Sequence, residues 1–489
     1  MKVLVLNPPF VKYYCRTERW AAVTRGRTLR PPDWLAMTAA ILRKDGHEIK
    51  LVDGPALDLN EAQVHDIIRE FKPDFAVVDC CTPSVYSDIA FAKACKELAG
   101  AKVLLVGPHP SAVVEETTKL AKGAADAIAI GEYDYIVRDY ARALARGESA
   151  SNTRGIAYME GDQVVRTAPM PVIENLDEIP FPTWDQIDVT KYWDSSKRHP
   201  YITIISGRGC PNRCTFCFWP QVMHGRRYRL RSAKNVVDEM EYDLKLFPNL
   251  KEIMFEDDTL TADRKRASQI CDEIMARGIH KKVSWAANAR ADLDDLELLK
   301  KMKRAGCRMF VTGFESGNPE ILKTIHKNTT IEKMRLFSKL CKKAGILVHG
   351  CFMIGLPGET KATARETINL TKMVDPDTIQ ISAAVPFPGT EFYDWAGKSG
   401  FLRVSDWREY LNPVGEQATF IGYPGLSTNE INELVDKGLR EFYFRPSKFF
   451  ALARRAIRPA DFPRYFYGMR QFLSYLMGKQ RLEKRVSTS

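Results

Sequence analysis

Short apolar segments alternate with helical periodicity through the first 150 residues. Each segment is four or five residues long, and together they cover residues 2–6, 49–53, 75–79, 102–106 and 127–130. Stretches with helical spacing of apolar residues follow them, for example 87–98 and 133–144. Strands this apolar are typical of a parallel sheet covered on both faces by helices. We therefore expect residues 1–150 to form an α/β, doubly wound, Rossmann-like domain.

The turns that follow these strands are short and rich in glycine and proline. They are "NPPF" (7–10), "DCCTPS" (79–84), "GPHPS" (107–111) and "GEYDY" (131–135). Doubly wound sheets bind ligands beyond the carboxyl ends of their strands, and such turns let backbone groups approach a ligand closely. No GxGxxG follows the first strand and the sequence has no GxxxxGK[ST], so dinucleotide and P-loop sites are disfavoured.

The alternation of strands and helices begins again after residue 200. Six further strand candidates cover residues 201–206, 251–256, 282–287, 308–313, 347–355 and 378–383. Six strands are fewer than the eight of a closed barrel, so we expect a partial (β/α)6 barrel with its site at the strand ends. We assign this barrel to residues 201–425 and a helical tail to residues 426–489.

Residues 151–200 are expected to link the two domains. The stretch "GIAYMEGDQVVRT" (155–167) predicts a small hairpin around Gly161. Four prolines then indicate an extended crossing segment, because proline fixes its own φ angle and disfavours helix in the residue before it. These prolines are Pro169, Pro171, Pro180 and Pro182.

Length and composition fit a globular chain with more than one core. The chain has 489 residues, of which 45% are hydrophobic and 27% charged. No apolar run approaches the roughly 18 residues of a membrane-spanning helix, and "MKVLVL" is too short for the apolar region of a signal peptide. Eleven scattered cysteines do not suggest a disulfide framework. We therefore expect a cytoplasmic protein.

The basic character of the chain belongs to its C-terminal tail. From residue 436 to the end there are 13 Lys and Arg against 4 Asp and Glu, which accounts for nine of the +11 net charge. Eleven Phe and Tyr lie between residues 442 and 475. This mixture suits an amphipathic helix at the inner face of an anionic membrane, or aromatic residues that pack on the barrel while arginines face solvent. Nucleic-acid binding is unlikely because no RNA-binding domain accompanies the tail.

Three cysteines occur in the stretch "GCPNRCTFC" (209–217), namely Cys210, Cys214 and Cys217. A structural zinc site normally needs four protein ligands, so zinc would require a distant residue such as His199 or His224. A non-catalytic metal-binding interaction module would follow from that alternative. In an iron–sulfur cube, three thiolates leave one iron open to bind a substrate or cofactor. The spacing therefore favours an open iron–sulfur cluster.

The C-x3-C-x2-C spacing, with Phe216 before the third cysteine and directly after the first barrel strand, resembles the radical S-adenosylmethionine (SAM) superfamily. The resemblance implies that a [4Fe-4S] cluster holds SAM and cleaves it to a 5′-deoxyadenosyl radical. It also implies SAM contacts at the ends of later strands, where a helix cap or tight turn is the simpler reading of each residue alone. The candidates are Glu256 and Asp257 for the SAM amino group, Arg290 for its carboxylate, Glu315 and Ser316 near SAM, and Gly355 near the adenine.

The N-terminal turns resemble those of B12-binding domains, as does the stretch "PPDWLAMTAAILRKDGHEIKLVD" (31–53). The D-x-H-x-x-G motif that supplies a histidine ligand to cobalt is absent, and we expect His109 to be a turn residue or hydrogen-bond partner. A domain that binds nothing is the alternative. The resemblance implies cobalamin contacts from Pro8, Thr82, Pro83, Ser84, Gly107, Pro108, His109, Gly131 and Glu132.

The two resemblances together imply a cobalamin-dependent radical SAM enzyme of the branch that includes the anaerobic magnesium-protoporphyrin ester cyclase and a hopanoid-associated member. Such an enzyme methylates an unactivated carbon of a small or lipid-linked metabolite, or carries out oxidative cyclisation or rearrangement without methyl transfer. Its reducing partner is expected to be a protein such as flavodoxin or ferredoxin. Trp219 and Tyr228 follow the cysteines and either line the substrate pocket or pack in the core.

Overall fold

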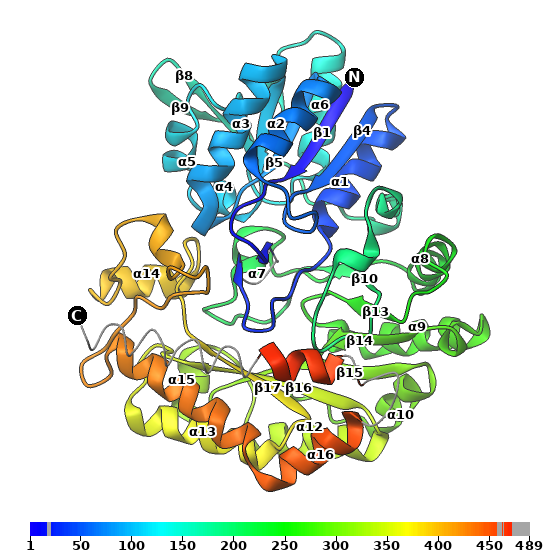
Figure 1. Cartoon of the computed structure of the whole chain (residues 1–489), viewed down its shortest axis with the longest axis vertical. Coiled ribbons are helices and arrows are strands. Elements are labelled where there is room, and N and C mark those ends of the chain that lie inside the picture. Colours follow the sequence, from blue (N-terminus) through cyan, green and yellow to red (C-terminus); the bar gives the residue numbers. More distant parts are fainter. Residues whose placement is uncertain (17–20, 457–461, 463, 472–489) are drawn as a thin grey trace.

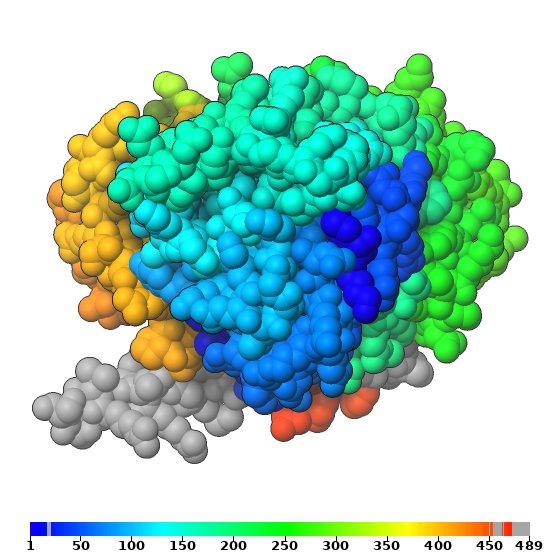
Figure 2. All heavy atoms as spheres, turned by 90° about the horizontal axis from the view of Figure 1, so that it is seen from above, coloured from blue at the N-terminus to red at the C-terminus, as the bar shows by residue number. Residues whose placement is uncertain are grey.

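The computed structural model describes residues 1–16, 21–456, 462 and 464–471. Two α/β units are stacked, with the N-terminal domain above the barrel (Figure 1). Seen from above, the blue and cyan N-terminal residues cover the centre of the molecule, and the later residues emerge on either side of them (Figure 2). The carboxyl ends of the N-terminal strands therefore face the barrel.

The N-terminal domain is a doubly wound sheet, as predicted. Its parallel strands are β1 (Lys2–Asn7), β4 (Glu48–Asp53), β5 (Phe75–Asp79), β6 (Lys102–Val106) and β7 (Ala127–Ala129), in the order β4-β1-β5-β6-β7. Alternate side chains of β1 face opposite layers of helices. One layer is α1 (Asp33–Lys44) and α6 (Asp134–Ala145), and the other is α2 (Glu61–Phe71), α3 (Val85–Ala99) and α5 (Val114–Leu120). The chain reverses direction across the sheet at β1, which is where such sheets bind ligands.

The hairpin around Gly161 is present, but it belongs to the N-terminal sheet. Its strands are β8 (Ile156–Glu160) and β9 (Gln163–Arg166), and β8 pairs antiparallel with β7. The hairpin covers backbone groups of β7 that would otherwise form an open sheet edge. The linker prediction for residues 151–200 did not include this pairing, because local periodicity carries no information about which strand a hairpin joins.

The barrel has the six parallel strands that the sequence predicts. They run in chain order as β10 (Tyr201–Ile204), β13 (Glu252–Phe255), β14 (Ser284–Asn288), β15 (Cys307–Glu315), β16 (Leu347–Ile354) and β17 (Thr378–Ala383). The helices that connect and cover them are α8 (Ala233–Leu246), α9 (Arg264–Ala276), α10 (Leu296–Arg304), α12 (Ile331–Ala344), α13 (Lys361–Val374) and α15 (Thr428–Tyr443). The sheet stops at β10 and β17, so the barrel has two edge strands.

Residues 21–31, which we call the strap, cross from the N-terminal domain to both edges of the barrel. The strap begins with β3 (Ala21–Val23), which pairs with β2 (Tyr14–Arg16). The Leu29 carbonyl accepts a hydrogen bond from the Tyr201 hydroxyl of β10 (3.0 Å), and Arg25 donates to the Ile381 carbonyl of β17 (3.0 Å). The strap therefore spans the seam between the edge strands, a contact that the sequence pattern does not predict.

The C-terminal region packs beside the barrel as helices. After α14 (Glu391–Lys398), a short turn η8 (Trp407–Tyr410) and α15, the chain continues as α16 (Pro446–Ala456), and residues 464–471 are helical. No described helix is long and apolar enough to cross a membrane. The helical tail predicted for residues 426–489 includes 457–461, 463 and 472–489, which lie outside the described residues.

Candidate active site

The cysteine loop lies between β11 (Gly207–Arg208) and α7 (Phe218–Val222), directly after the first barrel strand. Cys210 and Cys214 are buried and Cys217 is half-buried. Gly209 has a φ of 91°, and a Cβ there would lie 2.1 Å from the Arg227 carbonyl oxygen, so only glycine fits. The Thr215 N–H donates to the Ile325 carbonyl (3.1 Å), which ties the loop to the segment after β15.

No three His, Cys, Asp or Glu side chains among the described residues converge on one metal position. Zinc needs such convergence, whereas each thiolate of a cube ligates a different iron. His199 stacks on Trp193 with ring centroids 4.0 Å apart, and His224 accepts a hydrogen bond from the Gly209 N–H (2.5 Å). Both histidines therefore have partners within the protein in this structure.

A buried ion pair lies next to Cys214. Lys327 donates to Glu315 (2.9 Å), and the Cys214 sulfur lies 3.8 Å from the His326 carbonyl oxygen. Burial raises the pKa of the Cys214 thiol, and the Lys327 ammonium opposes that rise. Glu315 itself has a positive φ of 65°, a strained conformation that the pair helps to hold. Lys327 was not among the predicted site residues, although it lies in the segment that carries Glu315.

Glu256 and Asp257 have different surroundings although they are adjacent. The Asp257 carboxylate accepts from the Ser206 N–H (2.6 Å), the Ser206 hydroxyl (2.7 Å) and the Tyr228 hydroxyl (3.1 Å). Glu256 faces a cavity and accepts from Arg30 of the strap (3.1 Å). Glu256 therefore lies at the cavity and Tyr228 helps to fix Asp257, while the SAM contact expected of both carboxylates remains a prediction.

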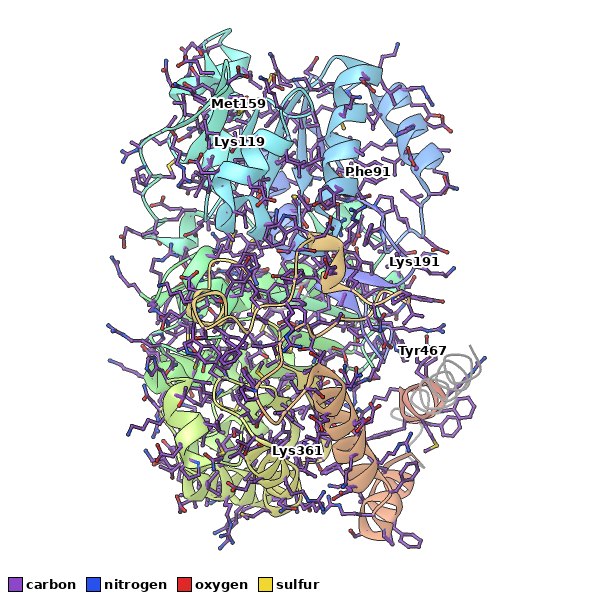
Figure 3. The ribbon with its side chains drawn as sticks, turned by 90° about the vertical axis from the view of Figure 1, so that its left-hand side faces the viewer. Phe91, Lys119, Met159, Lys191, Lys361 and Tyr467 are labelled. Atoms are coloured by element: carbon purple, nitrogen blue, oxygen red, sulfur yellow. The ribbon has the colours of Figure 1, made fainter. Side chains whose placement is uncertain are left out.

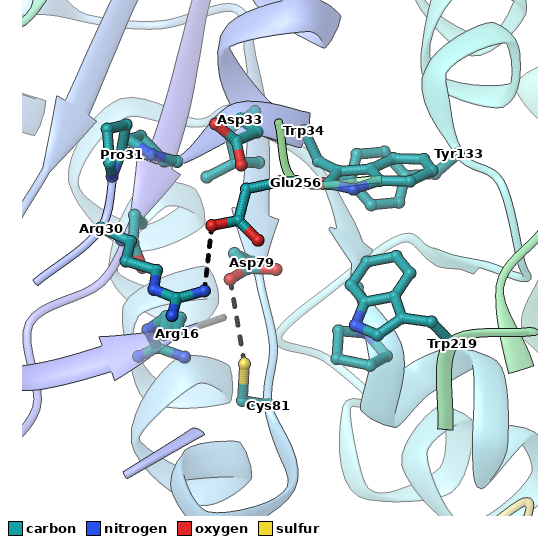
Figure 4. Close-up of a pocket in the computed structure, with 15 residues that line it drawn as sticks. Arg16, Arg30, Pro31, Asp33, Trp34, Asp79, Cys81, Tyr133, Trp219 and Glu256 are labelled. Atoms are coloured by element: carbon teal, nitrogen blue, oxygen red, sulfur yellow. Dashed lines mark hydrogen bonds and ion pairs between the residues drawn. The ribbon is translucent and has the colours of Figure 1, made fainter. Parts of the chain in front are cut away.

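A cavity of about 60 Å³ lies between the two domains and is lined from both sides (Figure 4). Asn7, Asp79 and Gly107 come from the carboxyl ends of the N-terminal strands, and Glu256 comes from the barrel. The strap and the start of α1 supply further polar and aromatic side chains. These side chains include Arg30, Asp33 and Trp34.

One wall of the cavity is aromatic. Trp34 stacks on Trp219 with ring centroids 5.1 Å apart and lies 5.7 Å from Tyr133 (Figure 4). The opposite side is charged, with Asp33 accepting a hydrogen bond from Thr203 of β10. Burial raises the pKa of Asp33 well above its ordinary value. The site therefore offers a stacking surface facing buried hydrogen-bonding groups.

Models of two protein families match the chain. The radical SAM superfamily matches residues 204–371 and the B12 binding domain matches residues 21–141. An uncharacterised methyltransferase of Pyrococcus horikoshii is 32% identical over 91% of this chain and 93% of its own length. The chain belongs to the radical SAM family with a B12-binding domain.

Two further comparisons support this assignment. An anaerobic magnesium-protoporphyrin IX monomethyl ester cyclase of Cereibacter sphaeroides is 28% identical over 86% of this chain and 68% of its own. The fold is that of the radical SAM methyltransferase TsrM from Kitasatospora setae, solved with cobalamin and a [4Fe-4S] cluster (TM-score 0.70, 18% identity, 91% and 89% coverage). This radical SAM enzyme accordingly has a [4Fe-4S] cluster, SAM and cobalamin as its cofactors.

The residues present fit those cofactors. In the described part of the chain, the buried Trp219 Nε1 and Asn7 Oδ1 atoms lie at the cavity without a hydrogen-bond partner, so a polar ligand could satisfy them. Gly107 has a φ of 108°, and a Cβ there would lie 2.6 Å from Asp79 Oδ1. The backbone can take this turn, which borders the cavity with Pro108, only because residue 107 has no side chain.

Two of the expected SAM contacts hold loops in this radical SAM domain. Arg290 forms a two-pronged ion pair with Asp292 (3.0 and 2.6 Å) and also donates to the carbonyls of Lys327 (3.1 Å) and Asn328 (3.3 Å). The Ser316 hydroxyl is fully buried, accepts from the Asn318 N–H (3.2 Å) and lies 3.3 Å from the Thr367 hydroxyl. Both side chains have protein partners in this structure, and their direct contact with SAM remains a prediction.

Gly355 lies in a tight turn that Glu359 stabilises. Gly355 has a φ of 96°, and Glu359 accepts from the N–H groups of Gly355 and Leu356 (3.3 Å to Leu356). The Tyr423 hydroxyl donates to the Gly355 carbonyl (2.8 Å). Burial raises the pKa of Glu359 to about 7. Glu359 was not among the predicted site residues, although it stands four residues after Gly355.

The turn at Thr82–Ser84 lies behind the cavity wall. The Nδ1 atom of His109 is hydrogen-bonded to the Thr82 hydroxyl oxygen at 3.2 Å. The centroid of the His109 ring lies 5.1 Å from that of the Trp407 ring. Burial lowers the pKa of His109 to about 3, so the ring is neutral, and it is a hydrogen-bond partner as expected. Thr82, Pro83, Ser84 and His109 do not line this cavity, and their contact with cobalamin remains a prediction.

Arg16 is hydrogen-bonded to Pro8 and Ser84, two residues that were expected to contact cobalamin. Its guanidinium pairs with Asp88 (2.6 Å) and donates to the Ser84 hydroxyl (2.9 Å) and the Pro8 carbonyl (3.0 Å). Asp88 is completely buried, and burial raises its pKa against the opposing effect of Arg16. This network holds Pro8 and Ser84 next to Arg16, which lines the cavity, and the contact of Pro8 and Ser84 with cobalamin remains a prediction.

Glu132 joins the domains. Its carboxylate pairs with Arg208 and with Arg229 (2.8 Å), and Asp134 also accepts from Arg208 (2.7 Å). Burial acts to raise the pKa of Glu132, but the two arginines hold it below its ordinary value. Gly131 donates its N–H to the Ser111 hydroxyl (2.9 Å). Glu132 is held by two arginines next to the cysteine loop, and the contact of Gly131 and Glu132 with cobalamin remains a prediction.

Proposed function

We propose that this radical SAM enzyme transfers a methyl group to an unactivated carbon of a small or lipidic metabolite. The observation that carries the proposal is the single cavity that the cobalamin-binding and SAM-binding domains line together. A methyl carrier on one side and a radical source on the other can act on one bound carbon only where both reach the same space. The 32% identity to a protein named as a methyltransferase, over nearly the whole length, supports the same reaction class.

We propose that Cys210, Cys214 and Cys217 ligate three irons of the cluster. Glu256, with Asn288 at 3.4 Å from its Oε2 atom, and the adjacent Asp257 are the candidates for the SAM amino group. When bound, the cluster with SAM supplies a carbon-centred radical and cobalamin carries the methyl group. Gly107, Pro108 and the aromatic wall would lie against cobalamin, because they line the face of the cavity nearest the N-terminal strands.

The substrate proposal follows from the cavity lining. The stacked Trp34 and Trp219 rings give a flat apolar surface that excludes water, and Arg30 and Asp33 supply buried polar groups. Asp33 lines the cavity, where burial raises the pKa of its carboxyl group well above the ordinary value, and it offers a hydrogen-bonding partner to a polar substrate group. We infer a substrate with a planar or apolar body and a neighbouring hydroxyl or carbonyl group.

Oxidative cyclisation is the second candidate, favoured by the 28% identity to a protein named as a magnesium-protoporphyrin ester cyclase. It would use the same cavity without methyl transfer. The products distinguish the two reactions. S-adenosylhomocysteine together with 5′-deoxyadenosine indicates methylation, whereas 5′-deoxyadenosine alone indicates cyclisation.

A small redox protein such as flavodoxin or ferredoxin is the proposed electron donor. The path from the cluster to solvent is short at His326, whose side chain is 54% exposed while its carbonyl oxygen lies 3.8 Å from Cys214. A donor that docks over this residue would reach the cluster without entering the cavity. Reduction of the cluster by purified flavodoxin or ferredoxin, followed by electron paramagnetic resonance, tests this proposal.

The cofactor assignment is tested by anaerobic purification after growth with cobalamin, counting iron, zinc and cobalt per chain. We expect about four irons and about one cobalt. Replacing Cys210, Cys214 or Cys217 by alanine should remove the iron and SAM cleavage, while Cys351→Ala on β16 should retain both. Zinc in place of iron, or unchanged SAM cleavage in all three variants, would contradict the cluster assignment.

A further inference from the structure

The helix at residues 464–471 packs against the protein with one face. Arg464 and Gln471 are only 5% and 8% exposed. The Tyr467 ring lies 4.5 Å from the Trp193 ring, and Gly468 lies against Ser195, where a Cβ would be 3.4 Å from the Ser195 Cβ (Figure 3 labels Tyr467). Residues 464, 467, 468 and 471 have the i, i+3, i+4, i+7 spacing of a single helical face. The orientation of this helix is therefore fixed.

The opposite face of this helix is apolar and open to solvent. Phe462, Phe466 and Met469, which we call the outer apolar face, are 52%, 60% and 47% exposed. They follow the i, i+4, i+7 spacing, and the Phe462 and Phe466 rings stack with centroids 5.8 Å apart. Two other aromatic side chains of the C-terminal region, Phe444 and Phe450, are 61% and 70% exposed. Exposed phenylalanines gathered in one short region mark an interaction surface.

The charge of the same region identifies the kind of partner. Thirteen Lys and Arg stand against four Asp and Glu from residue 436 to the end. Lys437, Arg440 and Arg470 are exposed in the described part. Two copies of a region this positive repel each other, which disfavours self-association through this face. Phenylalanines beside basic residues instead complement an anionic lipid surface, where rings enter the interface and cations meet headgroups.

We propose that the outer apolar face seats the protein on an anionic membrane surface. Phe462, Phe466 and Met469 enter the headgroup boundary, and the exposed basic residues contact anionic headgroups. Trp193, which holds Tyr467, is paired through its backbone with Leu29 of the strap (2.7 and 3.0 Å). The membrane therefore lies on the side of the molecule where the strap crosses the barrel seam. This inference does not depend on the reaction proposed above.

Flotation of the purified holoenzyme with vesicles tests the proposal. Vesicles of phosphatidylcholine with about one third phosphatidylserine should carry the wild-type protein, and pure phosphatidylcholine should carry at least tenfold less. The triple variant Phe462→Ser, Phe466→Ser, Met469→Ser should lose at least tenfold of the binding. A matched control replaces Leu57, Met373 and Val414 by serine, since they are 46%, 51% and 54% exposed elsewhere on the molecule. The control should float like the wild type.

Two results would overturn the proposal. One is equal flotation of the wild type and the triple variant, and the other is no flotation of the wild type on anionic vesicles. If the wild type does not float, its molar mass in solution is compared with that of the triple variant. A dimeric wild type and a monomeric triple variant would show that the outer apolar face is a contact between two copies of the chain. Unchanged iron content of the triple variant establishes that its fold is intact.

Discussion

At the scale of single residues, neighbours in the sequence have different roles because their side chains point to different surroundings. Glu256 opens on the cavity, whereas Asp257 is held by Ser206 and Tyr228. The stretch "FEDD" contains both, and nothing in its letters separates them. The same holds for Gly107 and His109, since one borders the cavity and the other lies behind it.

Gly107→Ala should lower cobalt content and stability more than Gly123→Ala. Both glycines have a positive φ, 108° and 82°, so each alanine costs about 1 kcal/mol of backbone strain. Only at Gly107 would the Cβ lie 2.6 Å from Asp79 Oδ1 and 2.9 Å from the Cys80 carbonyl oxygen; no atom lies within 4 Å at Gly123. Cobalt per chain and the apparent Tm measure the difference. Equal effects would show that the close approach is unimportant.

Glu359→Gln should remove a pH dependence of stability between about pH 4.5 and 7. Burial raises the pKa of Glu359 from 4.5 to about 7 in the folded state, so the folded protein binds more protons than the unfolded chain in that range. The free energy of unfolding therefore falls as pH rises through the range, by at most about 3 kcal/mol. The difference in apparent Tm between wild type and variant, measured from pH 5 to 8, should shrink toward pH 7 and then level off. A difference independent of pH would contradict this.

At the scale of elements, the cysteine loop depends on the domain above it. Arg208 immediately precedes Gly209, yet its guanidinium is held by Glu132 and Asp134 and lies 4.2 Å from the Trp34 ring. The backbone of the loop belongs to the barrel, while its entry is anchored in the cobalamin-binding domain. The position of Cys210 is thus set by both domains.

Glu132→Gln should destabilise the domain contact by about 3 kcal/mol, because it leaves Arg208 and Arg229 buried with one carboxylate fewer. The exposed Arg43–Asp185 pair, which joins α1 to the linker, is the control. Asp185→Asn should cost less than about 1 kcal/mol because both side chains are 41% exposed. Denaturant midpoints of the two variants measure the difference. Equal midpoints would mean that the buried ion pairs of Glu132 stabilise the protein no more than the exposed pair does.

At the scale of the whole molecule, the strap connects the two domains and forms part of the cavity between them. It crosses both edges of the barrel, brings Arg30 to Glu256 and buries Leu29 among residues of the barrel interior. A closed barrel would need no such element, because it has no edges. A six-stranded barrel leaves a seam, and the strap covers it with a segment of the other domain.

Leu29→Ala should open this seam. Leu29 is 9% exposed and packs with Tyr201, Met254 and Met309, so the truncation should cost about 2 to 3 kcal/mol. Hydrogen exchange at residues 21–31 should rise, since the Leu29 N–H is bonded to Trp193 (2.7 Å). Leu57→Ala, at a site 46% exposed, should leave exchange in the strap unchanged. Unchanged exchange in the Leu29 variant would mean that polar contacts alone hold the strap.

The sequence by itself determined the elements and the central chemistry. Continuous apolar runs and helices of period 3.6 are local properties, so the parallel strands of the first sheet and the six strands of the barrel could be predicted from the pattern. The three cysteines lie within eight residues of one loop, so their spacing is also local. Family resemblance then placed cobalamin and SAM in the right domains.

Only the tertiary structure decided which polar groups remain available to a ligand. Arg290, Ser316, Asp257 and Glu132 have types and positions that suit cofactor contacts, and the structure shows which partners, up to 97 residues away, hold them. Ser206 holds Asp257, and Arg208 and Arg229 hold Glu132. Arg30, Asp33 and Trp34 reach the cavity because the strap folds across the seam. A side chain's availability depends on contacts between distant segments, and periodicity and spacing record only neighbours along the chain.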